Sequence, residues 1–199
     1  MELNDVMMQR RSIRRYSDKP ITKDVIEQIL YAGSQAPSSK NRQPWRYVVV
    51  MGQAKEGMLK AMDEGLSREQ RGMSLLPNSQ QYMSGAYNTR SIMAQAPATI
   101  FVLNTLGSCN AFATTEEDRF YEWANIQSIG ASIQNMILTA TDLGLGSLWN
   151  CDIFFAHQEM QSWLDTNEQV IACFSIGYQE ENPEQRPRKP LESLVTWLE

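Results

Sequence analysis

Residues 130–149 of the chain read GASIQNMILTATDLGLGSLW and combine an apolar helical face, a glycine stop and a short strand. Apolar residues recur here and just upstream at spacings of three and four, the period of an α-helix with one broad buried face. Thr115 can cap the start of this helix and Gly144 suits its end, so we predict a helix from about Glu116 to Leu143 and a strand at 147–149. The residues of the apolar face are Ile126, Ile129, Ile133, Met136, Ile137 and Ala140.

Outward from this helix, runs of β-branched and aromatic residues predict further buried strands, and helical periodicity predicts further helices. Strands and helices follow one another in an irregular order, which favours an α+β fold in three layers over a doubly wound sheet. The further strands are expected at 45–51 (WRYVVVM), 98–103 (ATIFVL) and 170–178 (VIACFSIGY), and the further helices at 4–10, from Thr22 to about 36, and at 156–164.

The segment 53–95 departs from this regularity. Its helical stretches are interrupted by three glycines and a proline and are rich in polar residues, which predicts a partly exposed helical excursion or lid. No linker, repeat or low-complexity block divides the chain, so we expect residues 1–199 to form a single domain. A P-loop needs a Gly-Lys pair that is absent, and the glycines at 144 and 146 lack the third glycine of a dinucleotide fingerprint.

The balance of charge and cysteine excludes several classes of function. A net charge of −5 and a pI of about 5.0 disfavour binding to nucleic acid or to an anionic membrane surface. Neither a run of about 18 apolar residues nor a secretion signal is present, so we expect a cytoplasmic protein. The three cysteines, Cys109, Cys151 and Cys173, are widely spaced and are expected to be reduced.

His157 is the single histidine of the chain, and this limits the chemistry that side chains can perform. Metal sites with several imidazole ligands are impossible, and a Ser-His-Asp or Cys-His scheme would need this one residue. Because His157 lies at an expected helix start, a surface or capping role is the simpler interpretation. Demanding chemistry would therefore come from a cofactor rather than from a metal.

Basic residues gather in two short segments of this acidic chain, RRSIRRY near the start and RPRKP near the end. Guanidinium groups with an interleaved hydroxyl suit a phosphate, because all of them can donate to its oxygens. A solvated helix end and a charged tail are the alternative interpretation. The residues concerned are Arg10, Arg11, Ser12, Arg14, Arg15, Arg186, Arg188 and Lys189.

Two other segments have the composition of ligand-binding loops. Residues 36–45 place hydroxyls and amides between two prolines, which gives a short, stiff, hydrogen-bonding loop. Residues 144–149 carry two glycines that allow a flat ligand to approach the backbone. An ordinary helix-to-strand connection and a helix cap are the structural alternatives for these two segments.

Taken together, four segments resemble the nitroreductase family of FMN-dependent oxidoreductases in their order and spacing. The likeness covers most of residues 9–197, and only 53–95 is weakly matched. The resemblance implies a central mixed β-sheet flanked by helices, and a homodimer with two FMN sites at its interface and an exchanged C-terminal segment. The four segments are RRSIRRYSDKPI, ILYAGSQAPSSKNRQPWRYVVV, GASIQNMILTATDLGLGSLW and SIGYQEENPEQRPRKPLESLVTW.

The resemblance also implies which residues bind FMN. The family's first Arg-x-Ser-x-Arg/Lys motif matches Arg10 and Ser12, toward the phosphate and ribityl chain, and Arg14, toward the pyrimidine edge. Arg186 and Arg188 match a pair of tail cations at the phosphate. The other matches are Pro37, Ser38, Ser39 and Asn41 on a loop from the partner subunit, Gly146, Ser147 and Leu148 on a strand beside the ring, an N–H near Cys151 that faces flavin N5, and Asn88 and Arg90 near the ring.

A reaction follows from this likeness. Hydride from NADH or NADPH adds to N5 of FMN and passes in a ping-pong order to a small electron-poor acceptor such as a nitroaromatic, a quinone, an enone or free flavin. Arg14 would stabilise the anionic reduced ring. No protein nucleophile is implied, which agrees with a chain that has one histidine.

Other functions stay open from the sequence. A reductive dehalogenase or a flavin-destroying enzyme uses the same scaffold and would differ within 53–95. A flavin- or anion-binding regulatory module without turnover is an alternative from a different class. A structural dimer that has lost FMN is a third, but the two arginine segments argue against it, because such charges contribute little to a core.

Overall fold

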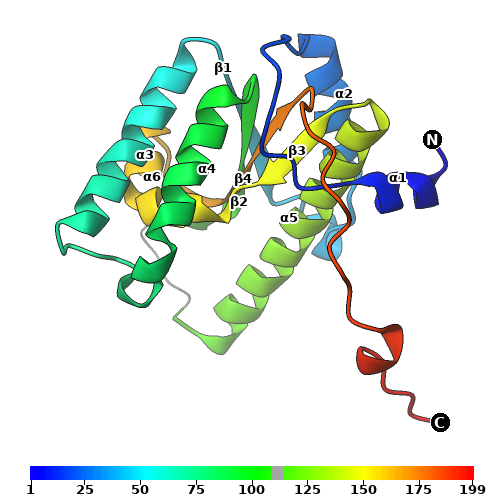
Figure 1. Ribbon diagram of the computed structural model, residues 1–199. Coiled ribbons are helices and arrows are strands. Elements are labelled where there is room, and N and C mark those ends of the chain that lie inside the picture. The colour runs from blue at the N-terminus through cyan, green and yellow to red at the C-terminus, as the bar shows by residue number, and fades with distance from the viewer. Residues whose placement is uncertain (109–113) are drawn as a thin grey trace.

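The computed structural model describes residues 1–108 and 114–199, so Cys109 lies outside the described residues. A four-stranded sheet in the order β1-β2-β4-β3 lies at its centre, with helices on both faces (Figure 1). Helices and strands in three layers confirm the expected α+β fold. The strands are β1 (Trp45–Met51), β2 (Ala98–Ser108), β3 (Gly146–Trp149) and β4 (Glu168–Gly177), all within a few residues of their predicted positions.

The sheet is antiparallel at every pairing of its four strands, whereas a mixed sheet was expected. Among residues 1–108 and 114–199, parallel pairing is limited to an isolated bridge between Ser12 and Ser147. The segment 10–16 forms no full strand beside β3, because within four residues its backbone pairs with a different part of the chain. Ile13 donates its N–H to the Ser147 carbonyl, and Tyr16 then pairs antiparallel with Gln179.

One face of the sheet is covered by α2 (Lys23–Ser34) and α5 (Glu116–Asp142). The long helix α5 starts at a capping box in which Thr115 and Asp118 satisfy each other's backbone N–H groups. The helix predicted from Glu116 to Leu143 is confirmed to within one residue. Its apolar face packs into a core rich in isoleucine, comprising Ile26, Ile29, Ile129, Ile133 and Ile137.

The other face is covered by α3 (Ala54–Gln70), α4 (Met83–Gln95) and α6 (His157–Trp163), with a 3-10 turn at Cys151–Ala156 before α6. The two helices within 53–95 are partly exposed, as expected, but each also buries one face, and a role of this segment as a lid stays a prediction. Met58, Met62 and Leu66 lie one helical turn apart on α3 and are fully buried against the sheet. The more exposed part of 53–95 is the connection from 71 to 82, which includes a 3-10 turn at Pro77–Tyr82.

Side chains alternate between the two faces of each strand, so one sheet contributes to two hydrophobic cores. On β2, Ile100 and Val102 face the α5 side, whereas Phe101 and Leu103 face the α3 side. Because both faces are covered, residues 98–103 of β2 and 170–176 of β4 are apolar apart from Thr99 and Ser175, as the sequence runs indicated.

The two ends of the chain lie along the same side of the molecule. The first helix, α1 (Leu3–Gln9), contacts α5, and the tail passes α1 and α5 before it ends away from the body (Figure 1). Within residues 1–108 and 114–199, no helix combines the length and apolarity needed to cross a bilayer.

Candidate functional site

The two arginine segments, far apart in sequence, line one cavity of about 450 Å³. Five of its eleven lining residues are arginines, and Glu184 is the acidic residue among them. The predicted convergence of these segments is therefore present in the structure. The lining residues are Met7, Met8, Arg10, Arg11, Ser12, Arg14, Pro183, Glu184, Gln185, Arg186 and Arg188.

The first arginine segment is positioned by packing and by backbone pairing. Helix α1 ends at Arg10, whose N–H donates to the Val6 carbonyl at 2.9 Å. The chain then extends along β3, and Ile13 is buried beneath it. Because side chains alternate along an extended chain, Ser12 and Arg14 are exposed on the opposite side from Ile13.

Arg11 has a structural role that the sequence did not reveal. Its Nη1 donates to the carbonyls of Met8 and Arg10 at 2.6 and 2.9 Å, at the C-terminal end of α1. Carbonyls at a helix end lack partners within the helix and carry partial negative charge, so a cation is stabilising there. Arg11 therefore helps to fix the end of α1 from which Arg10 projects.

The electrostatics of the cavity favour an anion. Burial lowers the pKa of Arg10, and repulsion from Arg188 and Arg11 lowers it further. Arginine stays protonated even so, which means that like charges are held together here at a cost in free energy. A bound anion would remove this repulsion.

A second cavity, of about 320 Å³, shares Arg10 and Ser12 with the first and extends toward β3. Ser147 lies in its lining, as the predicted strand contact requires, but three lining residues were not predicted. Trp149 is the last residue of the predicted strand, and its large aromatic side chain is the sequence feature that could have identified it as a lining residue. Gln134 and Ile137 are the other two; they lie on α5, and a sequence pattern does not separate them from ordinary helix residues.

The neighbours of Ser147 on β3 are explained by packing. A side chain on Gly146 would lie within 2.8 Å of Ile13, so glycine is required here for the close approach of segment 10–16. Leu148 belongs to a small buried cluster with Ile13, Tyr16, Ile92 and Ala96. The glycine at 144 has a positive φ of 77° just after α5, which is the helix-end role considered for it.

The residues that the resemblance assigns to a loop from a partner subunit lie outside both cavities of this chain. Ser39 and Asn41 begin and end a 3-10 turn between α2 and β1, and Ser38 Oγ accepts a hydrogen bond from the Gln43 N–H at 3.0 Å. Pro37 precedes this turn. Within one chain, therefore, the loop is not brought to the arginines.

Three further predicted residues also lie outside these cavities. Arg90 forms two hydrogen bonds of 2.7 and 2.8 Å with the Asp63 carboxylate, between α4 and α3. The expectation that Arg90 supplies a cation near the flavin ring stays a prediction, and its pairing with Asp63 is a structural role that the sequence did not indicate. Asn88 is exposed on α4. Partial burial and the neighbouring Asp152 raise the pKa of the exposed Cys151 thiol, so it is a weak nucleophile.

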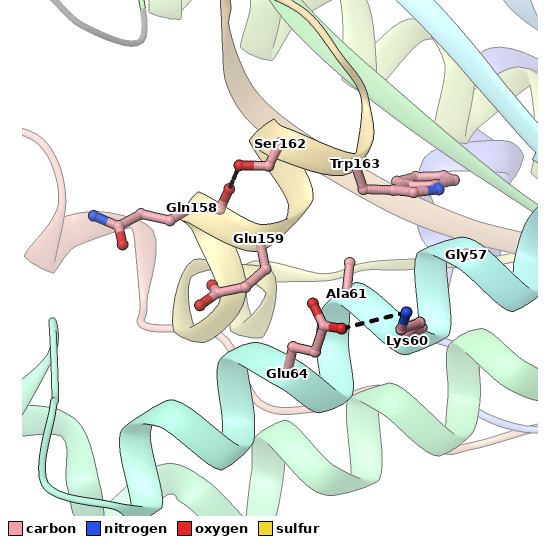
Figure 2. Close-up of a pocket in the computed structure, with 8 residues that line it drawn as sticks. All are labelled: Gly57, Lys60, Ala61, Glu64, Gln158, Glu159, Ser162 and Trp163. Atoms are coloured by element: carbon pink, nitrogen blue, oxygen red, sulfur yellow. Dashed lines mark hydrogen bonds and ion pairs between the residues drawn. The ribbon is translucent and has the colours of Figure 1, made fainter.

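A larger hollow, of about 670 Å³, lies between α3 and α6 (Figure 2). Its charged groups already have partners within the protein, and so does the Ser162 hydroxyl. Lys60 pairs with Glu64 at 3.7 Å, Glu159 pairs with Arg68 at 2.7 Å, and Ser162 Oγ donates to the Gln158 carbonyl. The hollow therefore presents no gathering of unbalanced charge comparable with the arginine cavity.

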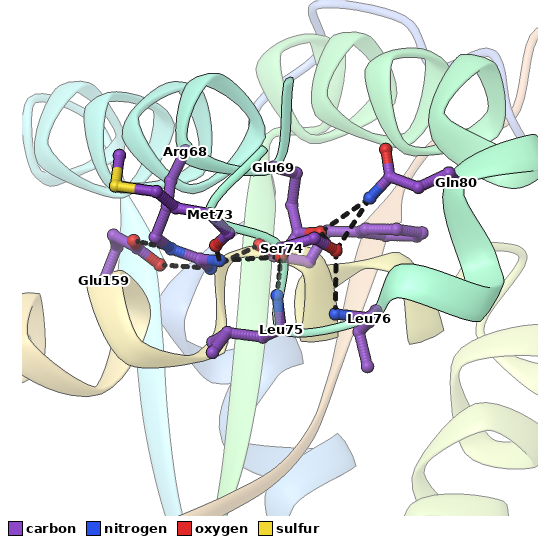
Figure 3. A network of polar contacts seen from close by, with 9 residues as sticks. Arg68, Glu69, Met73, Ser74, Leu75, Leu76, Gln80 and Glu159 are labelled. Atoms are coloured by element: carbon purple, nitrogen blue, oxygen red, sulfur yellow. Dashed lines mark hydrogen bonds and ion pairs between the residues drawn. The ribbon is translucent and has the colours of Figure 1, made fainter. Parts of the chain in front are cut away.

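Next to this hollow, a buried carboxylate fixes the connection after α3 (Figure 3). Glu69 is 2% exposed and accepts hydrogen bonds from Ser74 Oγ, the Leu75 N–H, Gln80 Nε2 and Arg68. Burial alone would raise the pKa of Glu69, but these donors outweigh it and lower the pKa to about 2. Glu69 thus stays ionised and holds the connection against the core.

The decisive comparison is with protein families. The model of the Nitroreductase family matches residues 7–178, which includes the first arginine segment and all four strands. This chain belongs to the nitroreductase family.

Individual members of the nitroreductase family match over nearly the whole chain. A nitrobenzene nitroreductase from Ectopseudomonas oleovorans is 26% identical, over 98% of this chain and 96% of the relative. A nitroreductase-like protein from Bacillus cereus has the same fold, with a TM-score of 0.77, 21% identity and coverage of 100% and 97%. An FMN-dependent nitroreductase from Mycobacterium smegmatis, solved in complex with NADPH, has a TM-score of 0.77, 19% identity and coverage of 98% and 97%.

Proposed function

We propose that this nitroreductase-family protein is an FMN-dependent oxidoreductase that transfers hydride from NADH or NADPH to a small electron-poor acceptor, such as a nitroaromatic, a quinone, an enone or free flavin. The arginine cavity is the observation that carries the proposal. The names of the relatives add support, since they include a nitrobenzene nitroreductase and an FMN-dependent enzyme solved with NADPH. Such a reaction belongs in the cytoplasm, where reduced nicotinamide is supplied.

The residues of the cavity fit FMN. Its phosphate carries two negative charges, and five arginines against one glutamate leave an excess of positive charge to receive it. Arg10, Arg186 and Arg188 would hold this phosphate. The hydroxyls of Ser12 and Ser147 suit the ribityl chain, because both can donate and accept hydrogen bonds.

Bound FMN supplies the hydride chemistry, so the chain needs no nucleophile of its own. Arg14 would place a permanent positive charge beside the ring and favour the anionic reduced form. Trp149 and Ile137 line the neighbouring cavity, where they exclude water from part of the site. The side chains of this chain would therefore bind and orient FMN and stabilise its reduced form by charge.

We further propose that two copies of this chain form the complete site. Pro37, Ser38, Ser39 and Asn41 lie outside the arginine cavities of their own chain, which is what a contribution to a partner requires. Large apolar side chains are also exposed on α5 and the tail, and association would cover them. They are Phe120, Trp123, Leu191, Leu194, Trp197 and Leu198.

The proposed function predicts a visible spectral change. Purified protein supplemented with FMN should retain the flavin through gel filtration, and the visible absorbance of the oxidised flavin should bleach under anaerobic conditions when NADH or NADPH is added. Flavin that is bound but stays oxidised with both nucleotides would favour a regulatory module. Loss of all flavin on the column would contradict the cofactor assignment.

Arg14→Ala should weaken FMN binding by about tenfold and slow flavin reduction by a similar factor, because a charge that stabilises the reduced ring is lost. Stopped-flow absorbance at saturating FMN separates the two effects. His157→Ala is the control, since His157 Nε2 only meets the Val170 carbonyl at 3.2 Å. An Arg14→Ala protein that is reduced at the normal rate would remove the assigned role.

A further inference from the structure

A carboxylate lies where the two arginine segments meet, although both segments are expected to bind an anion. Glu181 Oε1 accepts hydrogen bonds from the backbone N–H groups of Arg14 and Arg15, the second at 3.3 Å. Its Oε2 lies 3.6 Å from Arg15 Nε, and its side chain is only 21% exposed. One residue of the tail is thus bonded to two consecutive residues of the first arginine segment.

Glu181 completes a short series of contacts that ties the tail down. The Ser17 N–H donates to the Tyr178 carbonyl at 2.9 Å, and the Glu180 N–H donates to the Arg15 carbonyl at 3.0 Å. Arg15 Nη2 donates to the Glu180 carbonyl at 3.2 Å. Among the described residues, no hydrogen bond or ion pair joins the chain beyond Glu181 to the rest of the protein.

Among the described residues, Glu181 is therefore the last residue before Arg186 and Arg188 that a polar contact ties to the rest of the protein. Arg186 follows only five residues after it, so the last polar tether fixes where the tail cations begin. Without an anion Arg188 repels Arg10, which favours a tail that moves away. A tether opposes this movement and lowers the entropy that the tail loses when a ligand binds.

The carboxylate of Glu181 also forms no ion pair with the arginine side chains that line the cavity. It pairs with Arg15, which lies outside the lining of the cavity, and its other bonds are to backbone N–H groups. Arg10, Arg14, Arg186 and Arg188 thus remain available to an anion.

We propose that Glu181 is a positioning residue for phosphate recognition: it fastens the tail to segment 10–16 so that Arg186 and Arg188 meet the same phosphate as Arg10. This inference rests on the proposed binding of FMN. The proposal predicts a change in FMN affinity opposite in direction to the change expected from charge alone. Deleting a negative charge beside a phosphate site should strengthen binding by simple electrostatics, whereas loss of a tether should weaken it.

The test compares Glu181→Ala with Glu180→Ala, a neighbour of equal charge whose side chain is exposed. Dissociation constants for FMN and for riboflavin, which lacks the phosphate, are measured by quenching of flavin fluorescence. Glu181→Ala should weaken FMN by about tenfold and riboflavin by less than about twofold, while Glu180→Ala leaves both unchanged or tightens FMN slightly. Glu181→Gln keeps an acceptor oxygen and should retain part of the FMN affinity.

Amide hydrogen exchange of the flavin-free proteins gives a second readout that does not depend on FMN. Protection of the Arg14 and Arg15 amides should fall in Glu181→Ala and persist in Glu180→Ala. Unchanged FMN affinity, or an equal loss for FMN and riboflavin, would overturn the positioning role. If the wild-type protein binds no FMN, the proposed function fails, and the exchange data then decide whether Glu181 is a tether at all; normal protection in Glu181→Ala would show that it is not.

Discussion

FMN affinity is expected to fall by at least about 100-fold when Arg10 and Arg188 are both replaced by alanine, because each removes a charge-assisted interaction with the same phosphate. Arg10 lies on the first arginine segment and Arg188 on the tail, and burial together with the proximity of Arg188 lowers the pKa of Arg10. The double variant therefore removes one cation from each side of the cavity. Fluorescence titration with FMN measures the loss.

A matched control removes two positive charges elsewhere. Lys23 and Arg71 are both exposed and lie outside the arginine cavity, so the Lys23→Ala, Arg71→Ala double variant has the same net charge. It should bind FMN within about twofold of wild type, because exposed charges at a distance are screened. Equal losses in the two double variants would mean that net charge, not the cavity, governs flavin binding.

Glu69→Ala is expected to destabilise the protein by about 3–5 kcal/mol, the usual cost of removing one partner from a buried ion pair. Arg68 keeps Glu159 but loses one of its two carboxylate partners, and the donors at Ser74, Leu75 and Gln80 lose their acceptor. Urea unfolding measures the difference. Glu64→Ala on the same helix is the control, and it should cost less than about 0.5 kcal/mol because its pair with Lys60 is exposed.

The same carboxylate predicts how stability depends on pH. Folding lowers the pKa of Glu69 from its usual 4.5 to about 2, so its contribution is complete above about pH 4.5 and is lost as the pH falls toward 2. This contribution is at most about 3 kcal/mol. Glu69→Gln should therefore show a shallower fall in unfolding free energy over this pH range, and a slope equal to that of wild type would contradict the assignment.

The regular elements were predictable because their signals are local. The helix from 116 carries its own cap, its own apolar face and a glycine after its end, and the strands are short apolar runs. Helix α3 has an equally regular buried stripe, at Met58, Ala61, Met62, Gly65 and Leu66, yet its burial was missed. Methionine, alanine and glycine are weak signals of burial when lysine and glutamate alternate with them.

The site was predictable only in part, for a similar reason. The charge clusters near Arg10 and Arg186 are visible in the sequence, and the family resemblance placed them together. The pairing of Arg90 with Asp63 could not be predicted, because Asp63 lies 27 residues away on another helix. Gln134 and Ile137 line the neighbouring cavity through tertiary packing alone, and in the sequence Glu181 is one acidic residue among several in a polar tail.

Methionines lie both at the surface and in the core, so their oxidation can report which parts of the protein are accessible to solvent. Met7 and Met8 are exposed at the arginine cavity, whereas Met58 and Met62 of α3 are fully buried against the sheet. Peroxide converts accessible methionine to the sulfoxide and spares what it cannot reach. In a peptide map, sulfoxide at positions 7 and 8 would report an open cavity that a bound ligand can shield, while sulfoxide at 58 or 62 would report that the core itself had opened.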